Sequence, residues 1–335
     1  MTALDFAVPS RLEASAPAEV RGAGRDDVRM IVSELPAGRV TDTQFRNLPE
    51  FLQRGDLLVV NNSATLPAAL TALRESGETI TLHWSTALPA GLHTVEPRKI
   101  EARAGEVFTL PGGGRATLLA PYRDSKRLWI AHLEIDLPIA DYLRRWGRPI
   151  RYPYVTSTFP LSAYQTVYAR IEGSAEMPSA GRAFTRPILA CLRARGVGLS
   201  RLVLHTGVAS LESDEKPYEE WYEVPLRTAE RVRETRWRGG RVIAVGTTVV
   251  RALESSLDSH GDVVASKGWT DLVIQADREV RSVNGLLTGL HEPRATHLSM
   301  LEAIAGREAI EQAYAVALEN EYLWHEFGDL HLILR

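Results

Sequence analysis

The spacing of apolar residues changes character along the first half of the chain. Near the N-terminus, Phe45, Leu48 and Leu52 recur at three- and four-residue intervals, which predicts a helix, and the apolar run 57–60 predicts a buried strand. Residues 63–151 follow another pattern, in which short alternating strands are separated by Gly, Pro and charged turns. A block of this kind is typical of a small barrel or sandwich inserted into a larger domain.

Strands and helices alternate from about residue 152 to the end. The periodicity predicts a helix at 186–195, a strand at 202–205, a helix opening at Pro225, a strand at 241–245, a helix from 249, a strand at 270–275, helices at 295–305 and 308–321, and a strand at 330–334. This order indicates the α/β class, whose ligands collect at strand ends. We therefore predict a major α/β domain from residues 1–62 and 152–335, with residues 63–151 as a smaller inserted β-barrel domain.

One strand-to-helix corner has the composition of a ligand site. The apolar, β-branched run 241–245 stops at Gly246, Thr247 and Thr248, and a helical stripe follows. Gly allows close backbone approach, and a Thr at a helix start caps one N–H while others point outward with the positive end of the helix dipole. The corner suits a carboxylate, phosphate or ribose oxygen, and Arg251 would add a bidentate clamp. A capped turn without a ligand is the alternative interpretation.

Composition and charge narrow the class of protein. With 335 residues, 44% hydrophobic and 24% charged, the chain has the make-up of a globular protein of about two domains. A formal net charge of −3 gives no general attraction to nucleic acid, so an RNA partner needs a local basic face. No apolar run approaches about 18 residues, and the N-terminus lacks a secretory signal pattern, so we expect a cytoplasmic protein without a membrane partner. The single cysteine, Cys191, excludes an intramolecular disulfide.

Three polar residues lie where predicted strands end or begin. His205 ends a strand, His291 precedes a helix and Asp329 opens the last strand, and α/β proteins place reactive groups at such positions. A structural hydrogen bond is the alternative role for each histidine. The nine histidines show no H-x-H or H-E-x-x-H spacing, so no metal is expected. Walker, G-x-S-x-G and G-x-G-x-x-G motifs are absent from the sequence, which argues against ATPases, hydrolases and dinucleotide enzymes.

Two kinds of segment suit a flat ligand and a nucleic acid. Residues 178–181, Pro-Ser-Ala-Gly, suit close approach of the backbone to a flat ligand, or alternatively form a turn between core aromatics. Residues 141–154 interleave arginines with aromatic residues, and residues 227–241 carry six arginines against two glutamates; arginine with aromatic residues is the composition that holds phosphates and stacks bases. In the second of these, a solvated face of arginines paired with glutamates is the alternative.

Ordered motifs along nearly the whole chain carry a family resemblance. They are GDLLVVNNS, YQTVYA, PSAG with Phe184 and Thr185 after it, LHTG, EVP, RVIAVGTTVVRALES, LLTGLHEP and FGD. In this order they resemble the S-adenosylmethionine:tRNA ribosyltransferase-isomerase family of queuosine biosynthesis. The resemblance implies a major α/β domain with a smaller inserted β-barrel, in agreement with the pattern of apolar residues.

The same resemblance implies an activity and a set of site residues. The family moves the ribosyl part of S-adenosylmethionine onto 7-aminomethyl-7-deazaguanine in a tRNA, which gives epoxyqueuosine and releases adenine and methionine. S-adenosylmethionine is then a cosubstrate, and no metal is needed, because the sulfonium acidifies the neighbouring carbon. His205, His291 and Glu220 become candidate catalytic residues. The candidate residues for binding the cosubstrate are Pro178, Ser179, Gly181, Gly207, Gly246, Thr247, Thr248 and Arg251.

The chain departs from the family's motifs at several positions that the resemblance assigns to the site. Ala183 stands where A-A-P-T-A-G-L-H-F has its histidine, and that segment opens here with Glu176 and Met177. In the segment that matches M-H-S-E, residues 217–220, Tyr218 replaces the histidine while the carboxylate of Glu220 stays. The early I-P-A-R-L lacks its arginine, at Ala69. These losses affect groups suited to proton transfer and phosphate binding.

Two further motifs gain polar residues. Gly289, Leu290 and Glu292 replace the neighbours of the histidine in T-N-F-H-L-P, and Y-R-F-F-S-Y-G-D becomes YLWHEFGD at residues 322–329. Three functions therefore stay open: the family's tRNA modification, a paralogue that uses S-adenosylmethionine on a small molecule or cleaves it, and a binding protein without turnover. The tRNA function predicts that the arginines of 144–151 and 227–241 converge beside the pocket. Carboxylates of Glu176, Glu292 and Glu326 there would instead repel tRNA and favour an amine-bearing small substrate. We expect a monomer or weak oligomer.

Overall fold

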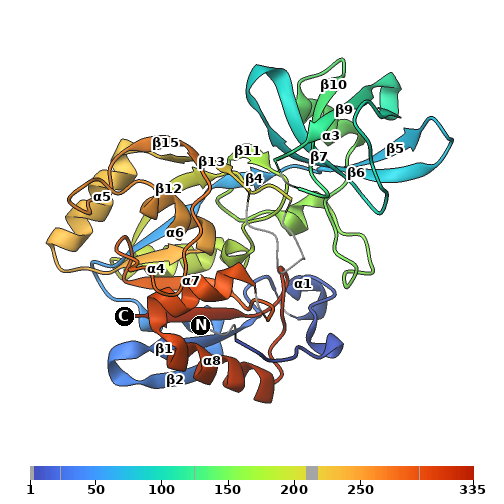
Figure 1. The fold of residues 1–335 in the computed structure, drawn as a ribbon. Helices are drawn as coiled ribbons and strands as arrows, with labels where there is room; N and C mark the ends of the chain where they lie inside the picture. The colour runs from blue at the N-terminus through green and yellow to red at the C-terminus, as the bar shows by residue number, and fades with distance from the viewer. Residues whose placement is uncertain (1–3, 23, 124, 209–217, 294) are drawn as a thin grey trace.

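A nine-stranded mixed sheet forms the centre of the larger part of the molecule (Figure 1). The computed structural model describes residues 4–22, 24–123, 125–208, 218–293 and 295–335. The strand order is β15 (Ser266–Thr270), β13 (Glu220–Val224), β12 (Gly198–Leu204), β3 (Leu57–Asn61), β14 (Val242–Val245), β16 (Gly285–Gly289), β17 (Leu330–Leu334), β1 (Arg29–Glu34) and β2 (Arg39–Gln44). The four central strands, from β12 to β16, run parallel. The α/β class predicted from the alternating pattern is confirmed.

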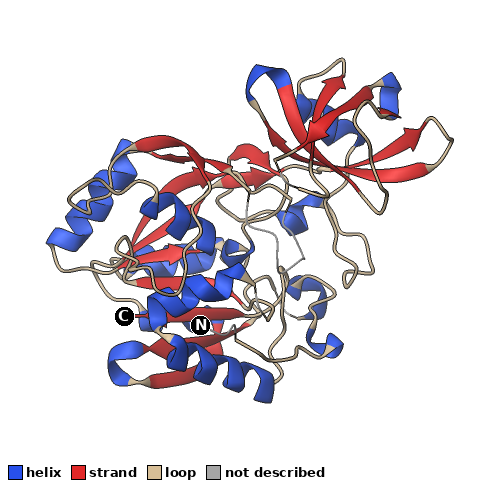
Figure 2. Ribbon diagram, in the orientation of Figure 1, coloured by secondary structure: helices blue, strands red, loops and turns tan. Residues whose placement is uncertain are grey.

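Alternate residues of β3 explain why helices cover both faces of this sheet (Figure 2). Leu57 and Val59 pack into one core, and Leu58 and Val60 pack into the other. The first core is covered by α5 (Leu226–Trp237), α6 (Thr247–Glu254), α7 (Thr296–Ala305) and α8 (Arg307–Glu319), and the second by α2 (Leu48–Phe51) and α4 (Arg186–Ala194). Because β3 is buried on both faces, its sequence is apolar at successive positions instead of alternating between apolar and polar residues.

Six strands within residues 63–151 form a closed barrel beside the sheet (Figure 1). Around the barrel they are β10 (Trp129–Glu134), β7 (Leu92–Pro97), β6 (Thr79–Ala87), β5 (Ala69–Arg74), β8 (Val107–Thr109) and β9 (Arg115–Pro121). The helix α3 (Ile139–Trp146) packs on the barrel core through Tyr142 and Leu143. The predicted barrel is confirmed, while the division of the chain at residues 62 and 151 stays a prediction.

Short elements connect the barrel to the sheet. Strand β4 (Ser63–Thr65) follows β3 and pairs in parallel with β11 (Ile171–Ser174), which lies after the barrel in the sequence. Through this pairing the chain leaves the major sheet and returns to it at neighbouring positions. Elsewhere, the one-turn helix α1 (Ala18–Arg21) lies in the N-terminal segment.

Two predicted elements differ from the structure. The helix expected around Phe45 and Leu52 is only a 3₁₀ turn followed by the four residues of α2, because the alternating segment before it extends β2 to Gln44 and Leu52 is already extended. The strand expected at 270–275 ends at Thr270. Beyond that residue the carbonyl of Leu272 accepts a hydrogen bond from an arginine side chain instead of pairing with a strand.

Candidate active site

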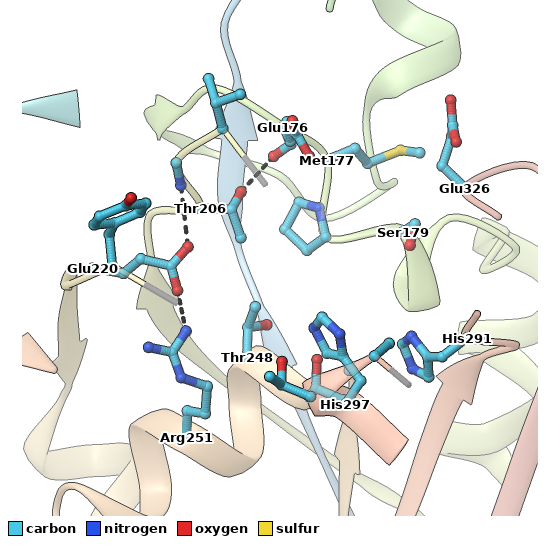
Figure 3. Close-up of a pocket in the computed structure, with 18 of the residues that line it drawn as sticks. Glu176, Met177, Ser179, Thr206, Glu220, Thr248, Arg251, His291, His297 and Glu326 are labelled. Atoms are coloured by element: carbon cyan, nitrogen blue, oxygen red, sulfur yellow. Dashed lines mark hydrogen bonds and ion pairs between the residues drawn. The ribbon is translucent and has the colours of Figure 1, made fainter. Parts of the chain in front are cut away.

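A cavity of about 380 Å³ lies between the barrel and the carboxyl ends of the central strands (Figure 3). Ser85, Thr86 and Thr94 line it from barrel strands β6 and β7. The facing wall comes from the residues that follow β12, β14 and β16, from the first turns of α6 and α7, and from the segments 176–180 and 325–326. This is the edge at which α/β folds bind ligands, so we take it as the candidate active site.

The corner at Gly246 lines this cavity as the sequence predicts, but its helix is capped differently. Gly246 is the N-cap residue, with φ 95° and ψ 150°, and no side chain caps α6. The predicted threonine cap is therefore wrong, because Thr247 already lies inside the helix and Thr248 Oγ1 accepts a hydrogen bond from Asn61 Nδ2 at 3.4 Å. Within the described part of the chain, the backbone N–H groups of Thr247 and Thr248 have no acceptor. They leave the corner suited to an anionic or hydroxyl oxygen.

The backbone of Gly246 gives a stability prediction. Its φ and ψ belong to a region that is essentially restricted to glycine, so we expect Gly246→Ala to lower the free energy of unfolding by about 1–3 kcal/mol. Steric contact contributes little, since an added Cβ would lie 3.6 Å from its nearest neighbours. Chemical denaturation followed by circular dichroism measures the change. Gly289→Ala is the matched control, because its Cβ would enter open space at an ordinary φ; an equal loss in both variants would contradict the backbone argument.

The segment around Ser179 contributes to the cavity, with one exception. Pro178, Ser179 and Ala180 line the cavity wall. Gly181 does not line it, and a Cβ there would lie 1.9 Å from the hydroxyl of Tyr168. Gly181 is thus explained by packing against a buried tyrosine, in contrast to its predicted role in binding the cosubstrate.

Glu220 and Arg251 form a buried ion pair in the cavity wall (Figure 3). The other carboxylate oxygen of Glu220 accepts the N–H of Gly207 at 3.1 Å. The Arg251 guanidinium also donates to the carbonyls of Leu272 at 2.9 Å and Thr270 at 3.2 Å. This guanidinium is engaged by the protein from three directions and links α6, β13 and the segment after β15, and the predicted clamp on a ligand carboxylate stays a prediction.

His205 lies outside the cavity lining. Its Nδ1 is 2.7 Å from the hydroxyl of Ser63, and its ring stacks on Trp221 with a centroid distance of 5.4 Å. Burial lowers the pKa of His205 to about 4. A role in proton transfer stays a prediction for this residue, but its contacts match the structural alternative.

His291 lines the cavity and stacks on a second histidine that the sequence interpretation missed (Figure 3). The rings of His291 and His297 are 4.6 Å apart and nearly parallel, and His291 Nε2 lies 2.8 Å from Thr288 Oγ1. Burial, followed by the charge of His297, holds the pKa of His291 well below its usual value; burial lowers that of His297 to about 4. Both rings are therefore neutral near pH 7. His297 was recognisable only by its place on the first turn of the helix after His291.

The charges around the cavity differ from the basic surface that tRNA binding predicts. Glu176, Glu292 and Glu326 all line the cavity, as do Glu219 and Glu220. No residue of 144–151 or 227–241 does so. Arg144 pairs with Glu172 and Asp141, Arg148 bonds Thr71, and on the second segment Arg231 bonds the carbonyl of Leu199 and Arg241 pairs with Asp56. Since Leu199 and Asp56 lie at the amino ends of β12 and β3, the arginines of the second segment lie at the edge opposite the cavity. The predicted convergence is wrong.

The described residues were compared with the requirements of a metal cluster and of a membrane-spanning helix. No group of three or more His, Cys, Asp or Glu side chains there has the arrangement of a metal site, and the prediction that no metal is required stays a prediction. Among the same residues, no helix has both the length and the apolar character needed to cross a membrane. Pro217, at the start of the segment that matches M-H-S-E, lies outside the described residues.

Fold and cavity together define an α/β protein with an inserted closed barrel and a polar, acidic ligand cavity between the two. Residues 1–333 match the queuosine biosynthesis protein family, and the chain belongs to that family. Relatives named S-adenosylmethionine:tRNA ribosyltransferase-isomerase include those of Halothermothrix orenii, 33% identical, and Thermotoga maritima, 35% identical, each aligned over 98% of both chains. The crystal structure of S-adenosylmethionine tRNA ribosyltransferase from Thermotoga maritima matches 98% of this chain and 99% of its own, with 30% identity and a TM-score of 0.57.

Proposed function

We propose that the protein is an S-adenosylmethionine:tRNA ribosyltransferase-isomerase. It transfers the ribosyl part of S-adenosylmethionine to 7-aminomethyl-7-deazaguanine in a tRNA, forms epoxyqueuosine, and releases adenine and methionine. The observation that carries this proposal is the similarity to relatives of that name over 98% of both chains. The cavity between barrel and sheet supplies the place for the reaction. A tRNA substrate also favours a cytoplasmic location.

The corner at Gly246 is proposed to hold the cosubstrate. The unpaired N–H groups of Thr247 and Thr248, at the positive end of α6, suit the methionine carboxylate or a ribose oxygen. Ser179 offers a hydroxyl from the facing segment, and the N–H of Gly207 is already taken by Glu220. Gly207 and Arg251 therefore belong to the wall that shapes the site, together with Glu220, rather than to groups that bind the ligand directly.

The acidic lining suits the charges of these two substrates. S-adenosylmethionine has a sulfonium and an ammonium group, and the acceptor base has an aminomethyl group that is protonated at neutral pH. Carboxylates in a partly buried cavity stabilise such cations more strongly than in water. An acidic cavity was expected to favour a small substrate with an amine, but the modified tRNA base also carries an amine. The acidic cavity is therefore compatible with a tRNA enzyme whose contacts to the tRNA phosphates lie outside the cavity.

His291 is proposed to assist departure of adenine as a neutral ring. A buried imidazole with a lowered pKa carries no extra proton near pH 7, but its N–H donates a hydrogen bond and its other nitrogen accepts one. Thr288 and the stacked His297 hold the ring in place. Abstraction of the proton next to the sulfonium needs a separate base, which this proposal does not assign.

Adenine release tests the proposed function directly. Purified protein is incubated with S-adenosylmethionine and with tRNA that carries either 7-aminomethyl-7-deazaguanine or an unmodified guanine, and adenine and methionine are separated by chromatography. We expect both products only with the aminomethyl base. Release without tRNA would indicate cleavage of the cosubstrate, and binding without release under any condition would indicate a protein without turnover.

A further inference from the structure

Carboxylates and aromatic rings in contact with one another line one part of the cavity. Figure 3 shows Glu176 beside Thr206 and Met177, and Glu326 on the side of the close-up away from the pair of Glu220 and Arg251. We call this part the acidic subsite; its residues are Tyr152, Tyr154, Glu176, Glu292, His325 and Glu326, and all of them line the cavity.

The rings of the subsite form a rigid stack that holds two of the carboxylates. Tyr152 and Tyr154 stack with centroids 5.7 Å apart, and Tyr154 and His325 stack at 4.1 Å with an interplanar angle of 11°. The hydroxyl of Tyr152 donates to Glu176 at 2.7 Å, and that of Tyr154 donates to Glu326. Because each carboxylate is oriented by a ring that is itself packed, the subsite is formed before any ligand arrives.

None of the six residues that form the subsite is a lysine or an arginine. Within the described part of the chain, no lysine or arginine forms an ion pair with Glu292 or Glu326. Burial raises the pKa of both carboxyls, and Glu13 raises that of Glu292 further. The Glu292 side chain is 47% exposed and Glu326 is partly buried, and a positively charged ligand would offset the cost of desolvating these carboxylates.

His325 contributes a buried nitrogen without a hydrogen-bond partner. Its side chain is 10% exposed, and its Nε2 has no such partner among the described residues. The nearest carboxylate oxygens, of Glu292 and Glu13, lie 3.5 and 4.0 Å away. Burial lowers the pKa of this histidine to about 4, so the ring is neutral near pH 7 and leaves the carboxylates uncompensated. Buried polar atoms are normally satisfied, so this one points to a ligand.

We infer that the acidic subsite binds a primary ammonium group of a substrate. The inference rests on the proposed function, whose two substrates each carry one such group: the aminomethyl group of the acceptor base and the α-ammonium of S-adenosylmethionine. The carboxylates at 176, 292 and 326 stand where the family motifs have Ala, Leu and Ser, so this chain has gathered three departures from separate motifs in one part of the cavity. Their convergence provides a negatively charged site that suits a cation.

Calorimetric binding measurements test the inference and distinguish the two sources. The proteins are the wild type, the double variant Glu292→Gln/Glu326→Gln, and Glu319→Gln on the exposed surface of α8 as control. The ligands are S-adenosylmethionine, free 7-aminomethyl-7-deazaguanine and 7-cyano-7-deazaguanine, which lacks the ammonium. Glutamine keeps the size of each side chain and an acceptor for the Tyr154 hydroxyl, and circular dichroism checks that the variants fold.

We expect the double variant to lose about tenfold or more in affinity for one ammonium-bearing ligand, with the cyano compound unaffected. A loss confined to the aminomethyl base assigns the subsite to the acceptor, and a loss confined to S-adenosylmethionine assigns it to the cosubstrate. Changes below about threefold for both, equal weakening of the cyano compound, or no binding of either ammonium-bearing ligand to the wild type would overturn the inference. Adenine release by the wild type is measured alongside. If the wild type releases adenine but the double variant binds both ammonium-bearing ligands as tightly as the wild type, only the inference about the subsite is rejected. If the double variant selectively loses affinity but the wild type releases no adenine, only the proposed function is rejected.

Discussion

Replacing Glu220 with alanine is expected to lower the free energy of unfolding by about 3–5 kcal/mol. The substitution leaves the Arg251 guanidinium, whose side chain is 9% exposed, with two backbone carbonyls but without its carboxylate partner. It also removes the acceptor of the Gly207 N–H. An unpaired buried charge is one of the few changes that produce a loss of this size.

Denaturant unfolding followed by fluorescence measures this effect. Glu223→Ala is the matched control, because Glu223 lies on the same strand and pairs with no arginine among the described residues. The double variant Glu220→Leu/Arg251→Met removes both charges, so we expect it to be more stable than Glu220→Ala. A loss below about 1 kcal/mol for Glu220→Ala would mean that the pair is not an essential link in the cavity wall.

His291→Ala is expected to lower turnover by about 100-fold or more, with the affinity for S-adenosylmethionine nearly unchanged. The imidazole lines the cavity and is fixed by Thr288 and by its stacked neighbour, so it is placed to act on the reacting groups and not to hold the cosubstrate. Single-turnover release of adenine gives the rate, and calorimetry gives the affinity. His260→Ala, at an exposed turn, is the control.

The same variant bears on the pH dependence. Burial lowers the pKa of His291 well below its usual value and that of His297 to about 4, so both rings stay neutral as the pH falls from about 8 to 6. The wild-type rate should therefore show no step from these histidines in that range, and any fall from protonation of His297 should come only nearer pH 4. Unchanged turnover in His291→Ala, or a histidine step near pH 6.5 that this variant abolishes, would contradict the assignment.

The apolar pattern predicted burial well because burial depends on spacing that the sequence displays. The run at 57–60 is buried on both faces, as its uninterrupted apolar residues predict. At 45–52 the spacing gave the correct buried residues but not the length of the helix, since Phe45 and Leu48 are buried from short turns. At 270–275 the pattern wrongly indicated a strand, because the carbonyl of Leu272 accepts a hydrogen bond from the Arg251 side chain instead of from a neighbouring strand.

The site was harder to predict because its side chains depend on partners that are distant in sequence. Gly246 and Thr248 were recognisable from local composition, since a strand-to-helix corner is a local feature. The partner of Arg251 is 31 residues away, and only the pairing of β12 with β13 brings Glu220 beside it. His297 was missed for a different reason: its partner His291 is close in sequence, but their stacking depends on the conformation of the loop that precedes α7, which the spacing of residues does not display.

The place of β1 in the sheet has a consequence for synthesis on the ribosome. Met30 pairs with Leu330, so the hairpin of β1 and β2 cannot join the sheet until β17 has left the exit tunnel. The barrel, by contrast, closes entirely within residues 69–134. The nascent chain therefore holds an early hairpin with an unpaired edge while a complete barrel forms behind it, which makes that hairpin the segment most exposed to chaperones and to aggregation.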